Sequence, residues 1–200
     1  MSDDTLSYVI DTRLYLNITD RCTLVCAFCP KTHDEHTVKG HDLTLHQRPS
    51  LEQIIAAVGD PTRYDEVVFC GFGEPTLRLK VLLAVARYIK DNGGHVRLNT
   101  DGLANLFHKR NVLPEMQGLI DAVSVSMNAQ NEAIYTRHCC PQLPGSYAAM
   151  LDFLRQAPAW IPEVTATAVN GLDGVDITAC ADLAAQLGVR FRARQLDVVG

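Results

Sequence analysis

The sequence predicts an α/β protein built as a partial (β/α)6 TIM-like barrel, a parallel sheet with helices outside. Six short runs rich in β-branched residues alternate with longer amphipathic runs, the pattern of parallel strands joined by crossover helices. The chain has 200 residues, fewer than the ~250 that a closed eight-fold barrel usually needs. Several expected strands also carry polar residues at every second position, as the lining of a barrel interior would.

The first half of the chain supplies two strands and two helices. Residues 8–19 are rich in β-branched and aromatic residues and predict a strand. Ser50 is a suitable N-cap for a helix over 51–58, with a glutamine at the capping-box position. A second strand is predicted over 66–72, and apolar residues three and four apart predict a helix over 79–90.

The second half repeats the same alternation of short and long elements. Short apolar runs predict strands over residues 95–100, 122–128, 164–170 and 189–195. Apolar residues at helical spacing predict helices over residues 103–109, 147–155 and 177–187. We therefore expect one domain over residues 1–200, with no linker inside it.

Polar residues alternate with apolar ones in three of these strands. They are Arg97 and Asn99, then Ser124, Ser126 and Asn128, then Arg190, Arg192 and Arg194. If helices cover the other face, these side chains line the barrel interior, where each unpaired polar group costs ~1–3 kcal/mol. An ordinary sheet with one solvated face is the alternative. Arg192 and Arg194 would bind an anionic substrate group in the first case and remain solvated in the second.

Composition and charge narrow the function classes. Hydrophobic residues make up 47% and charged residues 20%, which excludes a disordered or fibrous protein. The net charge is 18 − 23 = −5, so the chain lacks the basic field of a non-specific nucleic-acid binder. No apolar run approaches the ~20 residues of a membrane span, and no signal-peptide core follows the acidic N-terminus. We expect a cytoplasmic protein, in which seven cysteines indicate metal or redox chemistry rather than disulfides.

Cys22, Cys26 and Cys29 are the predicted metal ligands. Their C-x3-C-x2-C spacing follows the first expected strand directly. Three thiolates can hold three corners of a cubane iron–sulfur cluster and leave the fourth iron open to a substrate or cofactor. One alternative is a structural zinc site completed by His33 or His36, and another is a set of buried, inert thiols.

This cysteine motif, with the aromatic Phe28 before its last cysteine, resembles that of the radical S-adenosylmethionine (radical SAM) enzymes. The segment from Gly71 to Pro75 resembles their Gly-Gly-Glu motif at the end of the second strand. LNTDG and SVSMNA lie where the superfamily has polar segments, at the ends of the third and fourth strands. More narrowly, FCGFGEPTLRL, VRLNTDGLANL, VSVSMNA and IPEVTATAV resemble segments of the small TatD-linked radical SAM proteins.

The resemblance implies a partial (β/α)6 barrel with a 4Fe–4S cluster on the three cysteines. It also implies S-adenosylmethionine, whose amino and carboxylate groups chelate the open iron. The implied cofactor contacts are Phe28 at the adenine, Gly71 and Gly73 beside the methionine moiety, Glu74 at the ammonium, and Asn99, Ser124, Ser126 and Asn128 at the ribose or carboxylate. No catalytic residue beyond these is implied.

The implied reaction starts with one electron from the cluster, which cleaves S-adenosylmethionine to methionine and a 5′-deoxyadenosyl radical. That radical abstracts hydrogen from a substrate, which stays unassigned. The implied partners are a reductant such as flavodoxin or ferredoxin, a small-molecule or unknown substrate and, functionally, a TatD-type nuclease; a membrane is not among them. A 7-carboxy-7-deazaguanine synthase-like enzyme, a glycyl-radical activase and a non-catalytic zinc-binding adaptor are the alternatives.

Two further features have open roles. The remaining cysteines are Cys70, which falls inside an expected strand, and Cys139, Cys140 and Cys180. They either form an auxiliary cluster or serve as small buried hydrophobes. The loop over residues 31–49 carries four histidines and is long for a structureless segment, so we expect a lid or a segment that orders on binding.

Overall fold

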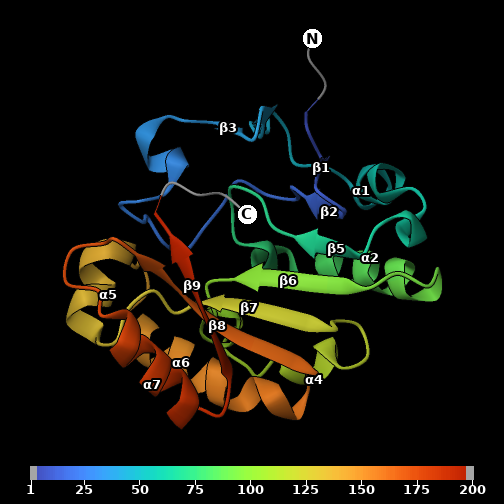
Figure 1. Cartoon of the computed structure of the whole chain (residues 1–200). Helices are drawn as coiled ribbons and strands as arrows, with labels where there is room; N and C mark the ends of the chain where they lie inside the picture. Colours follow the sequence, from blue (N-terminus) through green and yellow to red (C-terminus); the bar gives the residue numbers. More distant parts are fainter. Residues whose placement is uncertain (1–3, 197–200) are drawn as a thin grey trace.

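The structure, a computed structural model, describes residues 4–196 and contains one large curved sheet (Figure 1). Its seven strands are β1 (Ser7–Ile10), β2 (Arg13–Leu16), β5 (Glu66–Phe69), β6 (Val96–Thr100), β7 (Ala122–Ser126), β8 (Glu163–Asn170) and β9 (Arg190–Gln195), adjacent in that order. The strands from β2 to β9 are all parallel. Parallel strands placed side by side in chain order form a barrel wall, so the predicted partial barrel is confirmed.

Figure 1 shows the helices on the outer face of the curved sheet. They are α1 (Leu51–Val58), α2 (Leu79–Asp91), α3 (Ala104–His108), α4 (Leu113–Met116), α5 (Glu132–Cys139), α6 (Ser146–Gln156) and α7 (Ile177–Gln186). The predicted capping box at α1 is present, because Ser50 and Gln53 exchange side-chain and backbone hydrogen bonds. Within residues 4–196, no helix is long and apolar enough to cross a membrane.

The first predicted strand is in fact a hairpin. β1 and β2 pair antiparallel, with Ser7 opposite Leu16. Asp11 occupies the turn between them with φ 53°, in the left-handed region that aspartate tolerates better than most residues. The sequence prediction of one strand over 8–19 was therefore wrong, and only β2 joins the parallel sheet.

Two other predicted strands end early, and two helices were not predicted. β5 ends at Phe69, so Cys70 lies just after the strand and not inside it. β7 ends at Ser126, because Asn128 turns the chain with φ 61°. α4 is a single turn, and α5 has a mostly polar sequence whose periodicity is weak. α5 begins where the Asn131 side chain accepts a hydrogen bond from the backbone N–H of Ile134.

The hydrophobic core lies between the outer face of the sheet and the helices. Alternate strand residues such as Leu16, Phe69 and Leu98 are fully buried there. Leu82 and Ile89 of α2 are fully buried in the same apolar cluster. Covering this face by helices leaves the opposite face of each strand to form the barrel interior.

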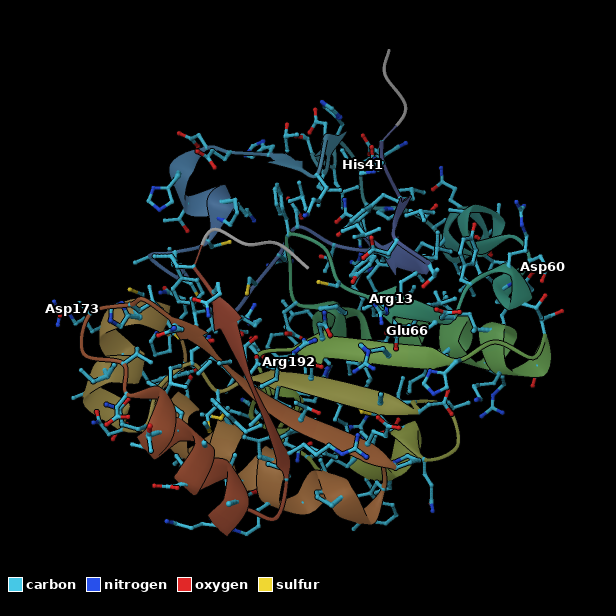
Figure 2. All side chains as sticks on the ribbon, viewed as in Figure 1. Arg13, His41, Asp60, Glu66, Asp173 and Arg192 are labelled. Carbon is cyan, nitrogen blue, oxygen red and sulfur yellow. The ribbon has the colours of Figure 1, made fainter. Side chains whose placement is uncertain are left out.

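The inner face carries the polar positions, as the sequence predicted. Asn99 of β6 lies opposite Ser124 of β7 in the strand register. Thr167 of β8 lies opposite both Ser126 of β7 and Arg192 of β9. In Figure 2, Arg192 lies on the side of the sheet that faces the viewer, away from the helices.

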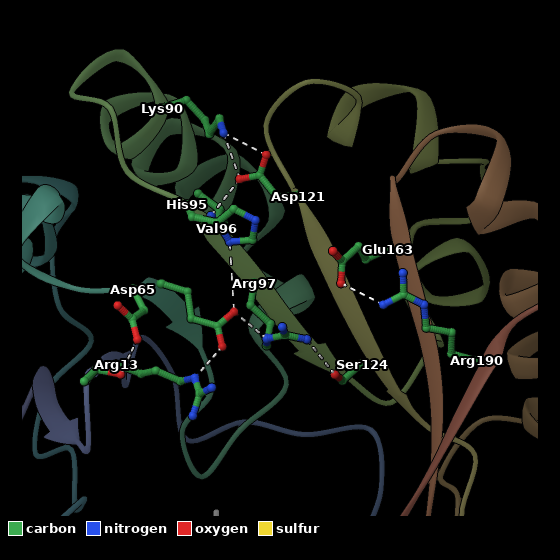
Figure 3. Close-up of polar contacts among 12 residues, drawn as sticks. Arg13, Asp65, Lys90, His95, Val96, Arg97, Asp121, Ser124, Glu163 and Arg190 are labelled. Carbon is green, nitrogen blue, oxygen red and sulfur yellow. Dashed lines mark hydrogen bonds and ion pairs between the residues drawn. The ribbon is translucent and has the colours of Figure 1, made fainter.

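An ion network joins the inner face at the amino ends of the strands (Figure 3). Glu66 of β5 pairs with Arg13 of β2 at 2.6 Å and with Arg97 of β6 at 2.7 Å. Arg97 also donates a hydrogen bond to the Ser124 hydroxyl of β7 at 3.4 Å. The network therefore joins β2, β5, β6 and β7 toward the end of the sheet opposite the cysteine loop.

The histidine-bearing loop over residues 31–49 is ordered in the structure. It contains the 3₁₀ helix η1 (Pro30–His33) and a small antiparallel pair, β3 (Thr37–Val38) and β4 (His41–Asp42). Val38 and Leu43 pack on Tyr8 of β1 in a second apolar cluster. The Asn17 side-chain amide fixes the loop further by donating to the Leu43 carbonyl at 2.9 Å.

Candidate cofactor-binding site

The cysteine loop follows the carboxyl end of β2 and is fixed by backbone pairing with the end of α5. The Val25 N–H donates to the Cys139 carbonyl at 3.2 Å, and the Ala27 N–H donates to the His138 carbonyl at 2.8 Å. These bonds place the loop over residues 22–29 alongside the last turn of α5. Ligands of parallel α/β sheets bind at this carboxyl edge of the strands.

The three predicted metal ligands share this loop and lie near one another. Cys22 is exposed, whereas Cys26 and Cys29 are half-buried. Although the residue is exposed, desolvation of the Cys22 thiol, followed by the charges of Asp101 and Glu74, raises its pKa to about 12. The neutral thiol is therefore favoured at Cys22, and bound iron would favour the thiolate because metal-bound thiols are deprotonated.

Cys139 is a fourth thiol at the loop, and no spacing in the sequence pointed to it. Its side chain is fully buried, and its sulfur accepts a hydrogen bond from Asn128 Nδ2 at 3.5 Å. A hydrogen bond with Cys139, followed by burial, raises the pKa of the Cys26 thiol. Cys139 therefore touches a predicted cluster ligand, whereas Cys180 is a buried apolar residue of the core.

The histidines proposed for a zinc site have other partners. His33 Nε2 lies 2.7 Å from the carbonyl oxygen of Ala27, and His36 Nδ1 lies 3.1 Å from the Thr44 hydroxyl. Among residues 4–196, no three His, Cys, Asp or Glu side chains are gathered in a way that could hold a single ion. A cubane binds each thiolate through a different iron atom, so its ligands lie further apart than those of one ion.

Gly71 and Gly73 pack against the segment that leads into the cysteine loop. A Cβ on Gly73 would lie 2.5 Å from the carbonyl oxygens of both Thr19 and Arg21, and a Cβ on Gly71 would overlap the Asn17 side chain. Real Cβ atoms do not approach this closely, so each position needs glycine. The close approach that these glycines permit is thus to the chain itself.

Glu74 is buried, and its carboxylate already has four donors from the chain. Its Oε1 atom accepts hydrogen bonds from the N–H of Thr76 at 2.9 Å, from the Thr76 hydroxyl at 2.6 Å and from the Thr100 hydroxyl at 2.9 Å. Its Oε2 atom accepts from the Asp101 N–H at 2.7 Å. Burial, then the charge of Asp101, raises the pKa of Glu74 to about 8. These contacts join the ends of β5 and β6, and the contact of Glu74 with an ammonium group stays a prediction.

Two of the predicted ribose or carboxylate contacts are also occupied within the chain. Ser124 accepts a hydrogen bond from Arg97 and belongs to the network at the other end of the barrel. The Asn128 side chain accepts from Arg194 Nη2 at 3.2 Å and donates to the Cys139 sulfur. Both side chains hold their neighbours in place.

Other polar atoms of the inner face lack partners among the described residues. The Oδ1 atom of Asn99 is buried without a hydrogen bond, and so is the Nε atom of Arg194. Ser126 lies half-buried on the same face at the end of β7. Buried orphaned donors and acceptors beside a thiol-rich loop fit a polar cofactor, because such groups are costly unless a ligand satisfies them.

Phe28 lies half-buried in the cysteine loop, beside a hollow in the surface. The hollow measures about 310 Å³ and is lined by Ala27, Phe28, Pro30, His33, Glu35, Leu172 and Leu196. It combines an aromatic ring with aliphatic and polar side chains, a composition that suits a planar heteroaromatic group. Phe28, which directly precedes Cys29, thus lines this hollow.

Comparison with known proteins identifies one family and one curated relative. The sequence model of the Radical SAM superfamily matches residues 16–184. The chain is 28% identical over 119 residues to an S-adenosylmethionine-dependent nucleotide dehydratase from Selenomonas ruminantium. That match covers 60% of this chain and 40% of the relative, so the chain spans less than half the length of the protein it resembles.

Several solved structures have a barrel that superposes on this chain. Streptococcus suis SuiB bound to the precursor peptide SuiA superposes with a TM-score of 0.71 at 12% identity, over 94% of this chain and 40% of that one. TYW1 with a lysine-pyruvate adduct bound superposes with a TM-score of 0.65 at 14% identity, over 94% of this chain and 66% of that one. At these identities the likeness supports the barrel fold alone.

Proposed function

We propose a reaction class from one established premise: this chain belongs to the radical SAM superfamily. We infer that it is an enzyme that cleaves S-adenosylmethionine reductively with a 4Fe–4S cluster and abstracts hydrogen from a substrate that is still to be identified. The observation that carries this proposal is the position of the three thiols. They lie at the carboxyl edge of the barrel, and the Glu74 N–H donates to the Arg21 carbonyl at 2.7 Å, which joins the Gly71–Glu74 loop to the cysteine loop.

The cluster ligands are Cys22, Cys26 and Cys29, with the fourth iron left for the cofactor. When bound, the cluster and S-adenosylmethionine together supply a one-electron cleavage that ends in hydrogen abstraction. Asn99 offers its free Oδ1 atom to a hydrogen-bond donor of the cofactor, such as a ribose hydroxyl. Phe28 contacts the adenine at the hollow beside the cysteine loop.

The remaining predicted cofactor residues, apart from Ser126, hold the cysteine loop and the inner-face side chains in position. Gly71 and Gly73 allow the loop after β5 to pack beneath the cysteine loop. Glu74 fixes that loop to the end of β6 through its four hydrogen bonds. Ser124 and Asn128 hold arginines of the inner face. Ser126 is left to contact the cofactor directly.

Finer features of the proposal rest on the sequence resemblance. We place the chain nearest the TatD-linked radical SAM proteins, because four of its segments resemble theirs, and we expect a functional link to a TatD-type nuclease. The electron donor is a protein such as flavodoxin or ferredoxin. One domain in the cytoplasm accounts for seven cysteines that are all free, since reducing compartments keep thiols reduced.

The relative's name suggests nucleotides as one class of substrate to examine. That protein is a nucleotide dehydratase, and it shares 28% identity with this chain over 119 residues. A 7-carboxy-7-deazaguanine synthase-like reaction and glycyl-radical formation on a partner protein are the competing reaction classes. Assays for the deazaguanine product and for a glycyl-radical signal separate them from the leading proposal.

Anaerobic reconstitution with iron and sulfide tests the function. We expect a brown protein with visible absorption, about four irons and four sulfides per chain, and formation of 5′-deoxyadenosine after reduction with S-adenosylmethionine. Cys26→Ala should abolish that product, because it removes one cluster ligand. Cys180→Ala is the matched control, since this buried thiol lies away from the loop, and it should retain the product. A colourless protein with one zinc, or a Cys26→Ala variant as fast as the parent, would contradict the proposal.

A further inference from the structure

We propose that Arg192 and Arg194 of β9 form an anion-binding subsite in the barrel interior, which binds a diphosphate group of the substrate. The inference rests on the proposed function, because it assigns a substrate class to the same barrel. It also answers the alternative left open by the sequence, namely whether these arginines face the interior or remain on a solvated surface.

Arg192 lies on the inner face of β9, and the residue is exposed. In the register it lies opposite Thr167, on the polar face of the sheet. Burial is the largest cause of the raised pKa of Tyr15 in β2, and the charge of Arg192 is a small opposing contribution. The curvature of the barrel therefore brings β9 and β2 within electrostatic reach of each other. Among residues 4–196, Arg192 has no carboxylate partner within ion-pair distance.

The acidic residues of the inner face are already paired with other arginines. Glu66 holds Arg13 and Arg97, and Glu163 pairs with Arg190 at 3.2 Å. The inner-face strand positions carry five arginines and two glutamates: Arg13, Arg97, Arg190, Arg192, Arg194, Glu66 and Glu163. Among residues 4–196, Arg192 and Arg194 of β9 therefore remain without a carboxylate partner.

One nitrogen of the Arg194 guanidinium has a hydrogen-bond partner, and another has none among the described residues. Its Nη2 atom donates to Asn128 Oδ1 at 3.2 Å, whereas its Nε atom is buried without a partner among the described residues. Burial, and after it the charge of Arg192, lowers the pKa of Arg194. Arg194 is half-buried, and a partly desolvated cation with no counterion among the described residues is costly, so an anion bound between the two arginines would offset both desolvation and mutual repulsion.

The spacing of the two arginines suits a group with two charged centres. Residues two apart on one face of a strand are separated by ~6.5–7 Å, and a guanidinium binds phosphate oxygens through two parallel hydrogen bonds. A diphosphate presents two such centres. A dicarboxylate presents similar oxyanions, and it is the competing ligand that the test must separate.

The subsite lies within a short chain of contacts from the cysteine loop. Arg194 donates to Asn128, Asn128 donates to the Cys139 sulfur, and the Cys139 carbonyl accepts from the Val25 N–H of the cysteine loop. A substrate anchored by its anionic group at β9 would thus extend toward the proposed cluster.

Direct binding measurements on the cluster-loaded protein test the subsite. Inorganic diphosphate and malonate are titrated calorimetrically into the parent, Arg192→Gln and Arg190→Gln proteins. We expect the parent to bind diphosphate and Arg192→Gln to bind it about 10–100-fold more weakly, the loss expected for one charge-assisted contact. Arg190→Gln removes the same charge from the same strand and face, but its arginine is paired with Glu163, so diphosphate binding should stay within about twofold.

Several outcomes would overturn the subsite. They are absence of diphosphate binding by the parent, equal losses in the two variants, and tighter binding of malonate than of diphosphate. An equal loss of S-adenosylmethionine affinity in Arg192→Gln would assign the residue to the cofactor instead. If Arg192→Gln does not fold, Arg192→Lys keeps the charge without the bidentate geometry and should weaken binding by a smaller factor. The titration needs no reductant, so a failure of the proposed function would appear in the separate reductive assay, as missing 5′-deoxyadenosine with diphosphate binding intact.

Discussion

Glu74 and Asp101 place two carboxyl groups together in the interior, directly beside the cysteine loop. Glu74 is 3% exposed and Asp101 is 5% exposed. Asp101 accepts a hydrogen bond from the Thr23 hydroxyl, next to the first cysteine, while Glu74 joins the ends of β5 and β6. Burial raises the pKa of both groups, and the charge of Asp101 adds to the shift of Glu74. One pair of side chains therefore ties together the loops after β2, β5 and β6.

The stability of the cluster-free chain should fall as pH rises, because of Glu74. Its folded pKa is about 8 against an ordinary value of 4.5, so the folded state binds more protons than the unfolded state between these values. The stabilisation is complete below pH 4.5 and is lost as pH rises through 8. Urea unfolding at pH 5, 6, 7 and 8 measures this slope. Glu74→Gln should flatten it, and should also lower the unfolding free energy at pH 5 by about 1–3 kcal/mol through the lost hydrogen bond.

Asp60→Asn is the control for this slope. Asp60 is exposed and caps a short helix through Thr62, and those hydrogen bonds lower its pKa from 3.8, so it does not titrate in the measured window. Its variant should keep the parental slope. A parent whose unfolding free energy rises from pH 5 to 8, or a Glu74→Gln protein with the parental slope, would contradict the assignment.

At the scale of elements, the two ends of the barrel have different tasks. The amino ends of β2, β5 and β6 meet in the network around Glu66, whose side chain is only 8% exposed. The carboxyl ends carry the cysteine loop, the Gly71–Glu74 loop and the buried atoms of Asn99 and Arg194 that lack partners among the described residues. Separation of a structural end from a ligand-binding end is usual in α/β barrels.

The network around Glu66 should stabilise the barrel more than the pair at its edge. Glu66→Gln leaves Arg13 and Arg97 without their carboxylate and should lower the unfolding free energy by about 1–3 kcal/mol. Glu163→Gln is the same change on the same face. The side chains of Glu163 and its partner Arg190 are 45% and 68% exposed, respectively, so the loss of unfolding free energy should be below about 1 kcal/mol. Chemical denaturation of both variants measures the difference. Equal losses would show that burial of the network does not matter.

At the scale of the whole molecule, local sequence patterns predicted the barrel because each strand and helix is encoded within a few residues. The elements that these patterns did not predict depend on local backbone geometry or on contacts between residues far apart in the sequence. The hairpin at residues 7–16 depends on Asp11 adopting a left-handed conformation, and α5 is stabilised by its cap and by the cysteine loop rather than by periodicity.

The candidate site was predictable as a set of motifs but not as a set of contacts. The cysteine spacing and the polar alternation could be read from neighbouring residues. The contact of Cys139 with Cys26 and the approach of Arg192 to Tyr15 depend on barrel curvature, which joins residues far apart in the sequence. For the same reason the sequence could not show that the Glu74 carboxylate is occupied by the chain itself.

Electron paramagnetic resonance of the reduced, reconstituted protein is the most direct test of an open iron held by Cys22, Cys26 and Cys29. The account predicts the signal of a reduced 4Fe–4S cluster that changes when S-adenosylmethionine is added. It also predicts a hyperfine coupling when the amino nitrogen of the cofactor is isotopically labelled, because that nitrogen would bind the open iron. A cluster signal unaffected by S-adenosylmethionine, or no cluster signal after reconstitution, would contradict the account.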